Sequence, residues 1–329
     1  MRNATLIASG AYVPEQVIPN SYFDLLLGED VSTWLESNVQ IYERRWCRDE
    51  ESTADLCINA AKEALKNANL DAKDIDLLIV TTDTPEYISP STASKVQHLC
   101  GMINAGTFDV NTACAGFVTG LDIATKYIKA DTQYNHVMVI GAYAMSKYLN
   151  KQDKKTVTLF ADGAGAVILK ASDDSDAGYL GSQLLTKGEY YSYMGIYGGA
   201  TAAPCSQSIL DDGEHQLQFV KKFPKELNPN VWSDMTRTLC QRNDITPLDI
   251  DHYFLTQINI NSIFETMDLL NVPQERATTI MHNYGYTGSA CIPLAFDKAM
   301  SENRVKKGQK LLFIGSGGGL AFASALFQF

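Results

Sequence analysis

The sequence has no surplus of positive charge, no long hydrophobic run and no secretory leader, and each absence excludes a class of protein. Its 27 Lys and Arg stand against 38 Asp and Glu, a net charge of −11, which argues against a general nucleic-acid or anionic-membrane surface. No run approaches the about 20 apolar residues that cross a bilayer, and the first ten residues lack the layout of a signal peptide. We therefore expect a cytoplasmic protein that binds neither nucleic acid nor membrane.

The cysteine and glycine patterns exclude further classes. The seven cysteines are odd in number and widely spaced, with no CxxC pair, which argues against a disulfide framework and a structural zinc site. No GxxxxGK[ST] loop is present, and the run 162–166 (DGAGA) lacks the spacing of a dinucleotide fingerprint. The sequence therefore predicts no metal and no bound cofactor.

Segments of strand and helix period alternate along the 329 residues, which is typical of an α/β protein. Apolar or β-branched runs predict strands at 77–82, 136–141 and 311–315, and two short strands around a glycine-containing turn within 156–169. Apolar residues at helical spacing predict helices over 54–68 and 116–129.

The chain also resembles itself. DIDLLIVT at 74–81 matches DIDHYFLT at 249–256, VMVIG at 137–141 matches LLFIG at 311–315, and TAC at 112–114 matches SAC at 289–291. Three matches in one order, each offset by about 175 residues, indicate two duplicated halves rather than a solenoid, whose repeat is about 20–50 residues. We place the boundary in the polar stretch 172–178, which divides the chain into 1–174 and 175–329.

Cys114 is the cysteine with a chemical reason for its position. A predicted strand ends at Val110, a short turn follows, and a helix begins near Gly116, so the thiol lies near a helix N-terminus. The positive end of the helix dipole favours thiolate over thiol, which predicts a nucleophile. A cysteine that only fills a gap at a tight turn is the alternative. The run 315–319 (GSGGG) follows another strand, and its glycines suit either a tight turn or backbone donors to an oxyanion.

These motifs together resemble one family. The segments 108–117 (FDVNTACAGF) and 160–166 (FADGAGA), the glycines at 317–319, and the opening 10–17 (GAYVPEQV) are similar to the β-ketoacyl-acyl-carrier-protein synthase III enzymes of the thiolase superfamily. The resemblance covers the whole chain and implies a five-layer αβαβα fold of two duplicated halves. It implies that Cys114 accepts an acyl group and that Gly318, with the Cys114 N–H, forms the oxyanion hole.

Two positions depart from the family pattern. Where the family has a catalytic His in a Pro-His-Gln-Ala-Asn motif, this chain has Leu255-Thr256-Gln257-Ile258-Asn259, so Thr256 stands at the His position. Where the family has Asn in a Gly-Asn-Thr motif, this chain has Gly285-Tyr286-Thr287. A threonine hydroxyl can donate a hydrogen bond but cannot act as a general base. His252 and His282 lie on the same two segments, and we expect both to be structural rather than substitute bases.

Substrate contacts also follow from the resemblance. Trp34 matches a tryptophan that stacks on coenzyme A, and Lys154 matches a nearby basic position. We also expect Asn259 to bind substrate. Asn38 replaces the stacking arginine, which favours a protein-carried acyl donor. Ser89 stands where many members have a Phe that reaches across the dimer to limit acyl length. The tyrosine-rich segment 189–199 either lines the acyl pocket or covers the surface with packed rings.

The sequence therefore predicts an acyltransferase that self-acylates on Cys114 from an acyl-coenzyme A or acyl-carrier-protein thioester, in specialised fatty acid or polyketide-type metabolism. One alternative is carbon–carbon bond formation with an activated β-ketoacyl extender. Another is a catalytically silent subunit that pairs with an active paralogue. The expected assembly is a homodimer, or a heterodimer in the last case.

Overall fold

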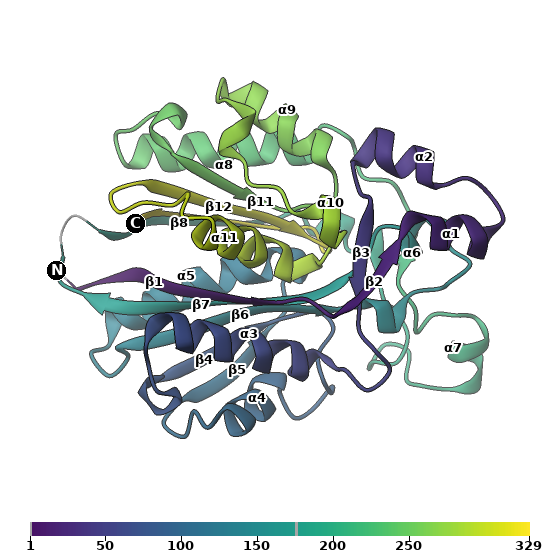
Figure 1. Ribbon diagram of the computed structural model, residues 1–329, viewed down its shortest axis with the longest axis horizontal. Coiled ribbons are helices and arrows are strands. Elements are labelled where there is room, and N and C mark those ends of the chain that lie inside the picture. Colours follow the sequence, from purple (N-terminus) through teal and green to yellow (C-terminus); the bar gives the residue numbers. More distant parts are fainter. Residues whose placement is uncertain (1, 175–176) are drawn as a thin grey trace.

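The computed structural model describes residues 2–174 and 177–329, and in it two β-sheets alternate with three layers of helices (Figure 1). The first sheet has the order β1-β7-β6-β4-β5 and the second β11-β12-β13-β8. The first contains β1 (Asn3–Tyr12), β4 (Leu77–Thr81), β5 (Gly106–Val110), β6 (His136–Ala144) and β7 (Asp162–Ser172). The second contains β8 (Gly178–Thr186), β11 (His252–Leu255), β12 (Lys310–Gly317) and β13 (Ala321–Gln328).

Helices cover both sheets on both faces (Figure 1). The outer face of the first sheet carries α3 (Thr53–Ala68) and α4 (Thr92–Cys100), and the outer face of the second carries α8 (Leu227–Arg242) and α9 (Ile260–Leu270). Between the sheets lie α5 (Gly116–Ala130) and α11 (Cys291–Ser301). Because both central helices are apolar nearly all round, they bury against a sheet on either side. No helix in the described ranges is long and apolar enough to span a membrane.

The two halves repeat the same elements. β11 begins at His252, 175 positions after β4 begins at Leu77, and α11 begins at Cys291, 175 positions after α5 begins at Gly116. The order β1-β7-β6-β4 in one sheet corresponds to β8-β13-β12-β11 in the other. The spacing equals the offset found in the sequence. The predicted boundary between residues 174 and 175 adjoins positions 175–176, which lie outside the described residues, and it stays a prediction.

Short elements outside the layers gather at one end of the molecule, to the right in Figure 1. They connect the layers and cover the carboxyl ends of the parallel strands. They are β2 (Gln16–Pro19), α1 (Asn20–Leu27), α2 (Ser32–Trp34), β3 (Glu43–Trp46), α6 (Lys154–Val157), β9 (Met194–Gly195), α7 (Gln207–Asp211), β10 (Gln218–Phe219) and α10 (Met281–Tyr284).

One predicted element was wrong. The segment 156–169 is not two strands around a turn but the end of α6 followed by the single strand β7. Its glycines lie within the strand because α11 packs against them: a Cβ on Gly165 would lie 2.6 Å from Pro293 Cβ and 2.9 Å from the Leu294 nitrogen. Glycine here permits close approach of a helix to a sheet rather than a turn.

Candidate active site

A cavity of about 770 Å³ opens at the end of the molecule where the parallel strands of both sheets stop. Its walls are mainly apolar and include Leu35, Leu159, Met194 and Phe223. It brings together seven of the eight predicted site residues: Cys114, Thr256, Tyr286, Gly318, Trp34, Lys154 and Asn259. A mostly apolar pocket with a few convergent polar groups is the ordinary form of a small-molecule site.

Cys114 lies at the N-terminal end of α5, as predicted. It belongs to a short 3₁₀ turn, Ala113–Ala115, that runs directly into the helix. Ala113 has a left-handed backbone (φ 47°), which is uncommon for a residue with a Cβ and redirects the chain after β5. Cys114 is 2% exposed, so its thiol faces the cavity from within the core.

Glycines at the end of β12 hold this turn from the other side. A Cβ on Gly317 would lie 2.4 Å from the Cys114 nitrogen and 2.6 Å from the Thr112 carbonyl oxygen, so only glycine fits there. At Gly318 a Cβ would meet nothing closer than the Met194 carbonyl oxygen at 3.4 Å. Gly317 therefore permits the backbone of β12 to approach Cys114 closely, whereas Gly318 has free space beside it and borders the open cavity.

The Tyr286 hydroxyl lies beside the Cys114 thiol, and hydrogen bonding between the two lowers the pKa of that thiol. The Tyr286 backbone is fixed to the loop before β7, because the Tyr286 N–H donates to the Leu159 carbonyl (2.8 Å) and the Ala161 N–H donates to the Tyr286 carbonyl (2.9 Å). The buried ring packs against Phe160, with ring centroids 5.3 Å apart. Tyr286 therefore presents its hydroxyl in a fixed position.

The protonation state of the Cys114 thiol differs from the sequence-based expectation. Burial raises its pKa well above the ordinary cysteine value, and the carboxylate of Asp83 raises it further, while the hydrogen bond from Tyr286 opposes this. The thiol, not the thiolate, is therefore the resting form near neutral pH. The helix N-terminus was predicted correctly, but desolvation of the thiolate outweighs it.

Thr256 uses its hydroxyl within the sheet. The Ser316 N–H donates to Thr256 Oγ1 (3.0 Å), and Thr256 Oγ1 donates to the Ser316 carbonyl oxygen at 3.4 Å. The side chain thus extends the pairing of β11 with β12. Although Thr256 borders the cavity, its proton is directed at the backbone rather than at a bound molecule.

Comparisons with known proteins fit this geometry. A family model described as 3-oxoacyl-[acyl-carrier-protein] synthase III matches residues 108–188, and the model of its C-terminal part matches 240–329. The β-ketoacyl-[acyl-carrier-protein] synthase III of Caldanaerobacter subterraneus subsp. tengcongensis is 33% identical over 326 residues, which cover 99% of this chain and 97% of that relative. This chain belongs to the β-ketoacyl-acyl-carrier-protein synthase III family. Its fold is thiolase-like, as predicted.

Solved structures agree with this assignment. The synthase III of Aquifex aeolicus superposes with a TM-score of 0.89 at 29% identity, covering 99% of this chain and 100% of that one. The priming β-ketosynthase of the R1128 polyketide pathway gives 0.88 at 25% identity, covering 99% and 96%. OleA of Xanthomonas campestris, at 0.83 and 20% identity over 99% and 98%, shares the fold.

At the mouth of the cavity, the synthase III chain combines an exposed ring with paired charges. Trp34 is 54% exposed, and Lys154 Nζ contacts both carboxylate oxygens of Glu29 at 3.0 Å. Lys155, Lys222 and Lys225 add further positive charge to the rim. Asn259 caps α9 by accepting a hydrogen bond from the Asn261 N–H (3.0 Å). The rim is therefore net positive although the protein is acidic.

Ser89 is the predicted site residue that the structure does not bring to the cavity. It is exposed in the loop after β4, beside Ile88, which is 86% exposed. The tyrosine-rich segment 189–199 fits the interpretation of a surface cover with packed rings, because the ring centroids of Tyr190 and Tyr193 lie 4.9 Å apart. From this segment, Met194 reaches the cavity.

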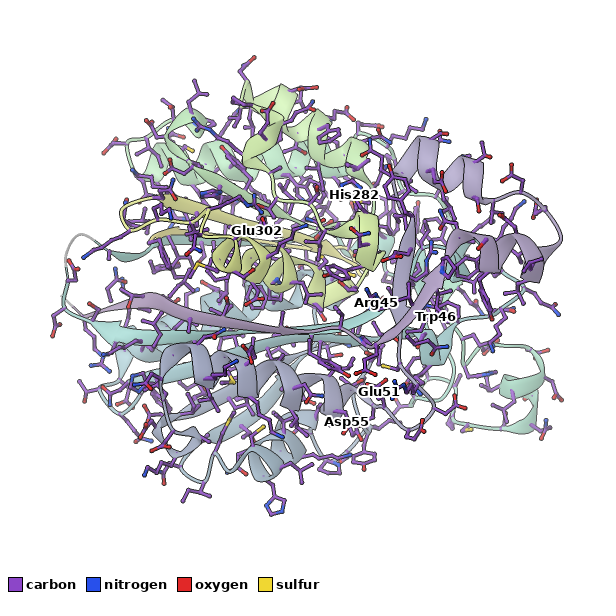
Figure 2. The ribbon with its side chains drawn as sticks, in the orientation of Figure 1. Arg45, Trp46, Glu51, Asp55, His282 and Glu302 are labelled. Atoms are coloured by element: carbon purple, nitrogen blue, oxygen red, sulfur yellow. The ribbon has the colours of Figure 1, made fainter. Side chains whose placement is uncertain are left out.

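Neither His252 nor His282 lines the cavity. His252 Nε2 lies 3.2 Å from Gln309 Oε1, at the far end of β11. His282, on α10 beside β3 (Figure 2), uses Nδ1 to contact the Gln40 carbonyl oxygen (2.8 Å) and Nε2 to contact Thr279 Oγ1 (3.2 Å). Both rings have hydrogen-bond partners outside the cavity, and that neither acts as a base stays a prediction.

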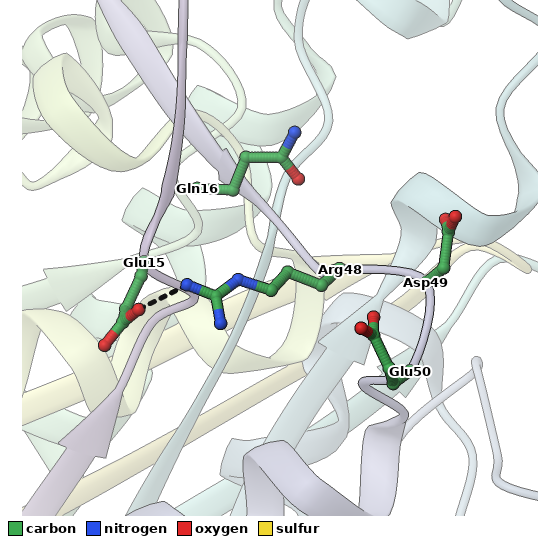
Figure 3. Close-up of a pocket in the computed structure, with 5 residues that line it drawn as sticks. All are labelled: Glu15, Gln16, Arg48, Asp49 and Glu50. Carbon is green, nitrogen blue, oxygen red and sulfur yellow. Dashed lines mark hydrogen bonds and ion pairs between the residues drawn. The ribbon is translucent and has the colours of Figure 1, made fainter.

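Sequence reasoning missed the cavity residues contributed by the segment after β9. Phe219, Val220 and Phe223 come from the ribbon of β9 and β10 and the loop after it, and no periodic pattern marks them. A second hollow of about 490 Å³ lies on the surface among Glu15, Gln16, Arg48, Asp49 and Glu50 (Figure 3). Its single cation, Arg48, is paired with Glu15 at 2.5 Å.

Proposed function

We propose that this protein is an acyltransferase that takes an acyl group from a thioester onto Cys114 and passes it to a nucleophile. The observation that carries the proposal is a buried thiol that faces an apolar cavity and accepts a hydrogen bond from Tyr286. Apolar walls suit an acyl chain, and a thiol is the nucleophile that exchanges readily with thioesters. The backbone around Gly318 supplies donors for an oxyanion.

We infer that Thr256 and Tyr286 occupy the positions of the family's His and Asn, which makes the triad non-standard. Removal of one oxyanion donor costs about 100- to 1000-fold in rate. Because the Thr256 proton is directed at Ser316 and Tyr286 is hydrogen-bonded to Cys114, neither is free to stabilise a malonyl enolate. Decarboxylative condensation should therefore be slow, which favours simple acyl transfer in specialised metabolism.

The synthase III relatives of Caldanaerobacter and Aquifex are named for the acyl carrier protein, and we propose that this chain also accepts an acyl-carrier-protein or coenzyme A thioester. The positive rim around Lys154 and the exposed ring of Trp34 suit a phosphate-bearing donor. Asn38 offers no planar cation for stacking, which favours the protein-carried donor. A homodimer fits the free edge of β5, the last strand of the first sheet.

The family name supports a second candidate, carbon–carbon bond formation with a β-ketoacyl extender, which needs no decarboxylation. Incubation with an acyl thioester, and then with labelled malonyl or β-ketoacyl carriers, separates the two by product. Acyl transfer predicts no carbon-chain extension.

The decisive experiment is intact-mass analysis of the purified protein after incubation with acyl thioesters. We expect one acyl adduct on the wild type and none on Cys114→Ala. An absent adduct on the wild type, or an adduct that persists in Cys114→Ala, contradicts the proposal. If activity appears only when a paralogue is added and survives Cys114→Ala, the silent-subunit alternative holds instead.

A further inference from the structure

Asp83 is a partly buried acid near Cys114 that the sequence-based reasoning did not single out. It follows β4 by two residues, and the residues on both sides of it are fixed to neighbouring strands. The Thr82 N–H donates to the Val110 carbonyl at the end of β5 (3.1 Å), and the Ala144 N–H at the end of β6 donates to Thr84 Oγ1 (2.9 Å). Asp83 therefore lies between the carboxyl ends of β5 and β6.

The end of β4 places Asp83 near the start of α5. Thr81 faces α5, because a Cβ on Gly116 would lie 3.2 Å from Thr81 Cβ. The pairing with β5 ends at Thr82, and Asp83 lies in the bend directly after it, two residues from Thr81 and near the turn that holds Cys114. On β6, Gly141 pairs with Thr81, and the next position on that face is Tyr143.

The electrostatics agree with this placement. Burial raises the pKa of Cys114, of Tyr143 and of Tyr148, and the Asp83 carboxylate is the next largest cause in each case. Asp83 Oδ1 is buried and has no hydrogen-bond partner. Burial also raises the pKa of Asp83 to about 6, although a hydrogen bond from its own backbone N–H opposes this.

An ionised carboxylate with one unpaired oxygen is costly in a protein interior, and the hydrogen bond from its own backbone N–H offsets only part of that cost. The titratable groups that face it are Cys114 from the turn after β5, and Tyr143 and Tyr148 from β6 and the turn after it. Glu86 of its own loop is ion-paired with Lys95 (2.5 Å). An acid with a perturbed pKa near a nucleophile that lines a cavity is a candidate functional arrangement.

We propose that Asp83 is the proton acceptor for Cys114 during acylation, which rests on the acyl transfer proposed above. The proton leaves Cys114 Sγ for the Asp83 carboxylate as Sγ bonds to the carbonyl carbon of the thioester. The carbon–sulfur bond of the donor then breaks, and the proton passes from Asp83 to the departing thiolate. The acyl group has moved from one sulfur to the other with no net gain or loss of protons.

The role of proton acceptor and the role of neighbouring charge predict effects of opposite sign. If Asp83 were only a negative charge, Asp83→Asn would remove repulsion from the thiolate, lower the pKa of Cys114 and speed acylation. If Asp83 accepts the proton, Asp83→Asn slows acylation by about 100-fold or more, the usual contribution of a general base. The wild-type acylation rate should fall at low pH around the Asp83 pKa of about 6, and this fall should disappear in Asp83→Asn.

The experiment measures the rate of Cys114 acylation by an acetyl thioester of N-acetylcysteamine, followed by intact mass between about pH 5 and 8 across the Asp83 pKa of about 6. Asp131→Asn is the matched control, because it removes a carboxylate from the exposed turn at the opposite end of α5. Asp83→Glu retains a carboxylate and should recover part of the rate and the fall at low pH. Thermal unfolding of each variant checks that it folds.

An Asp83→Asn variant that acylates as fast as the wild type, or faster, overturns the role of Asp83 and leaves the proposed function standing. An Asp83→Glu variant as slow as Asp83→Asn also overturns it. If Asp83→Asn does not fold, the wild type decides: an acylation rate that is independent of pH below neutrality overturns the proposed role of Asp83. A wild type without any adduct overturns the proposed function itself.

Discussion

The hydrogen bond from Tyr286 to Cys114 can be tested without any assumption about the substrate. Tyr286→Phe removes the hydroxyl and keeps the ring, which packs on Phe160 at 5.3 Å and on Tyr143 at 6.5 Å. Because that hydrogen bond lowers the pKa of the Cys114 thiol, its loss raises the pKa further. Less thiolate is then present at any given pH, and alkylation slows.

The size of the effect follows from the strength of the bond. A hydrogen bond to a charged group is worth about 1.5–3 kcal/mol, and about 1.4 kcal/mol corresponds to tenfold in rate. We therefore expect alkylation of Cys114 to slow by about 10- to 150-fold. The stability cost is smaller, about 0.5–1.5 kcal/mol, because the lost bond in the resting protein joins two neutral groups.

The assay is carbamidomethylation by iodoacetamide, followed at the level of single peptides. Cys205 is exposed and serves as an internal reference for reagent activity. Tyr253→Phe is the matched control, since it removes another buried tyrosine hydroxyl, which donates to the Pro247 carbonyl (2.7 Å) far from the cavity. If Tyr286→Phe alkylates at Cys114 as fast as Tyr253→Phe does, the hydrogen bond does not tune this thiol.

The other predictions concern the walls of the site. Gly317→Ala should lower stability by about 1–3 kcal/mol and abolish acylation, because the new methyl group meets only backbone; Gly318→Ala, whose methyl group has room, should retain near wild-type stability in denaturant titrations. His282→Gln should keep the rate of adduct formation within about threefold, because the ring lies outside the cavity; a loss of about 100-fold would make it a base. Glu29→Gln should free Lys154 from its ion pair and so lower KM for a coenzyme A donor. Lys154→Ala should change KM by at most about fivefold, because in the wild type Lys154 is held in a surface ion pair.

Much of the fold and of the site could be predicted because its signals are local. The apolar run of β4 is buried throughout, and the strand-turn-helix spacing placed Cys114 at the start of α5. The prediction of two strands within 156–169 was wrong because glycines at a helix contact and glycines at a turn look alike in sequence. The direction of the Thr256 proton depends on β12, about 60 residues away, and no local pattern encodes it.

Asp83 shows a signal that was present and not used. An acidic residue directly after an apolar parallel strand marks the sheet edge at which active sites form, and Asp83 follows β4 in this way. That one of its carboxylate oxygens is buried without a partner, however, depends on how β5 and β6 end, and this becomes visible only in three dimensions. The same holds for the protonation state of Cys114, because burial is a property of the assembled core.

The raised pKa of Cys114 is consistent with catalysis once the cavity is considered. A thiolate exposed at a helix N-terminus would react with any electrophile that reached it, whereas a buried neutral thiol reacts only when a proton acceptor is beside it. Burial both raises the pKa of the Cys114 thiol and excludes water from the thioester that would form on it. An acyl group that must wait for its acceptor benefits from both effects. A site that holds its nucleophile neutral and places a carboxylate with one unpaired oxygen nearby is therefore better suited to acyl transfer within the cavity than to reaction at the surface.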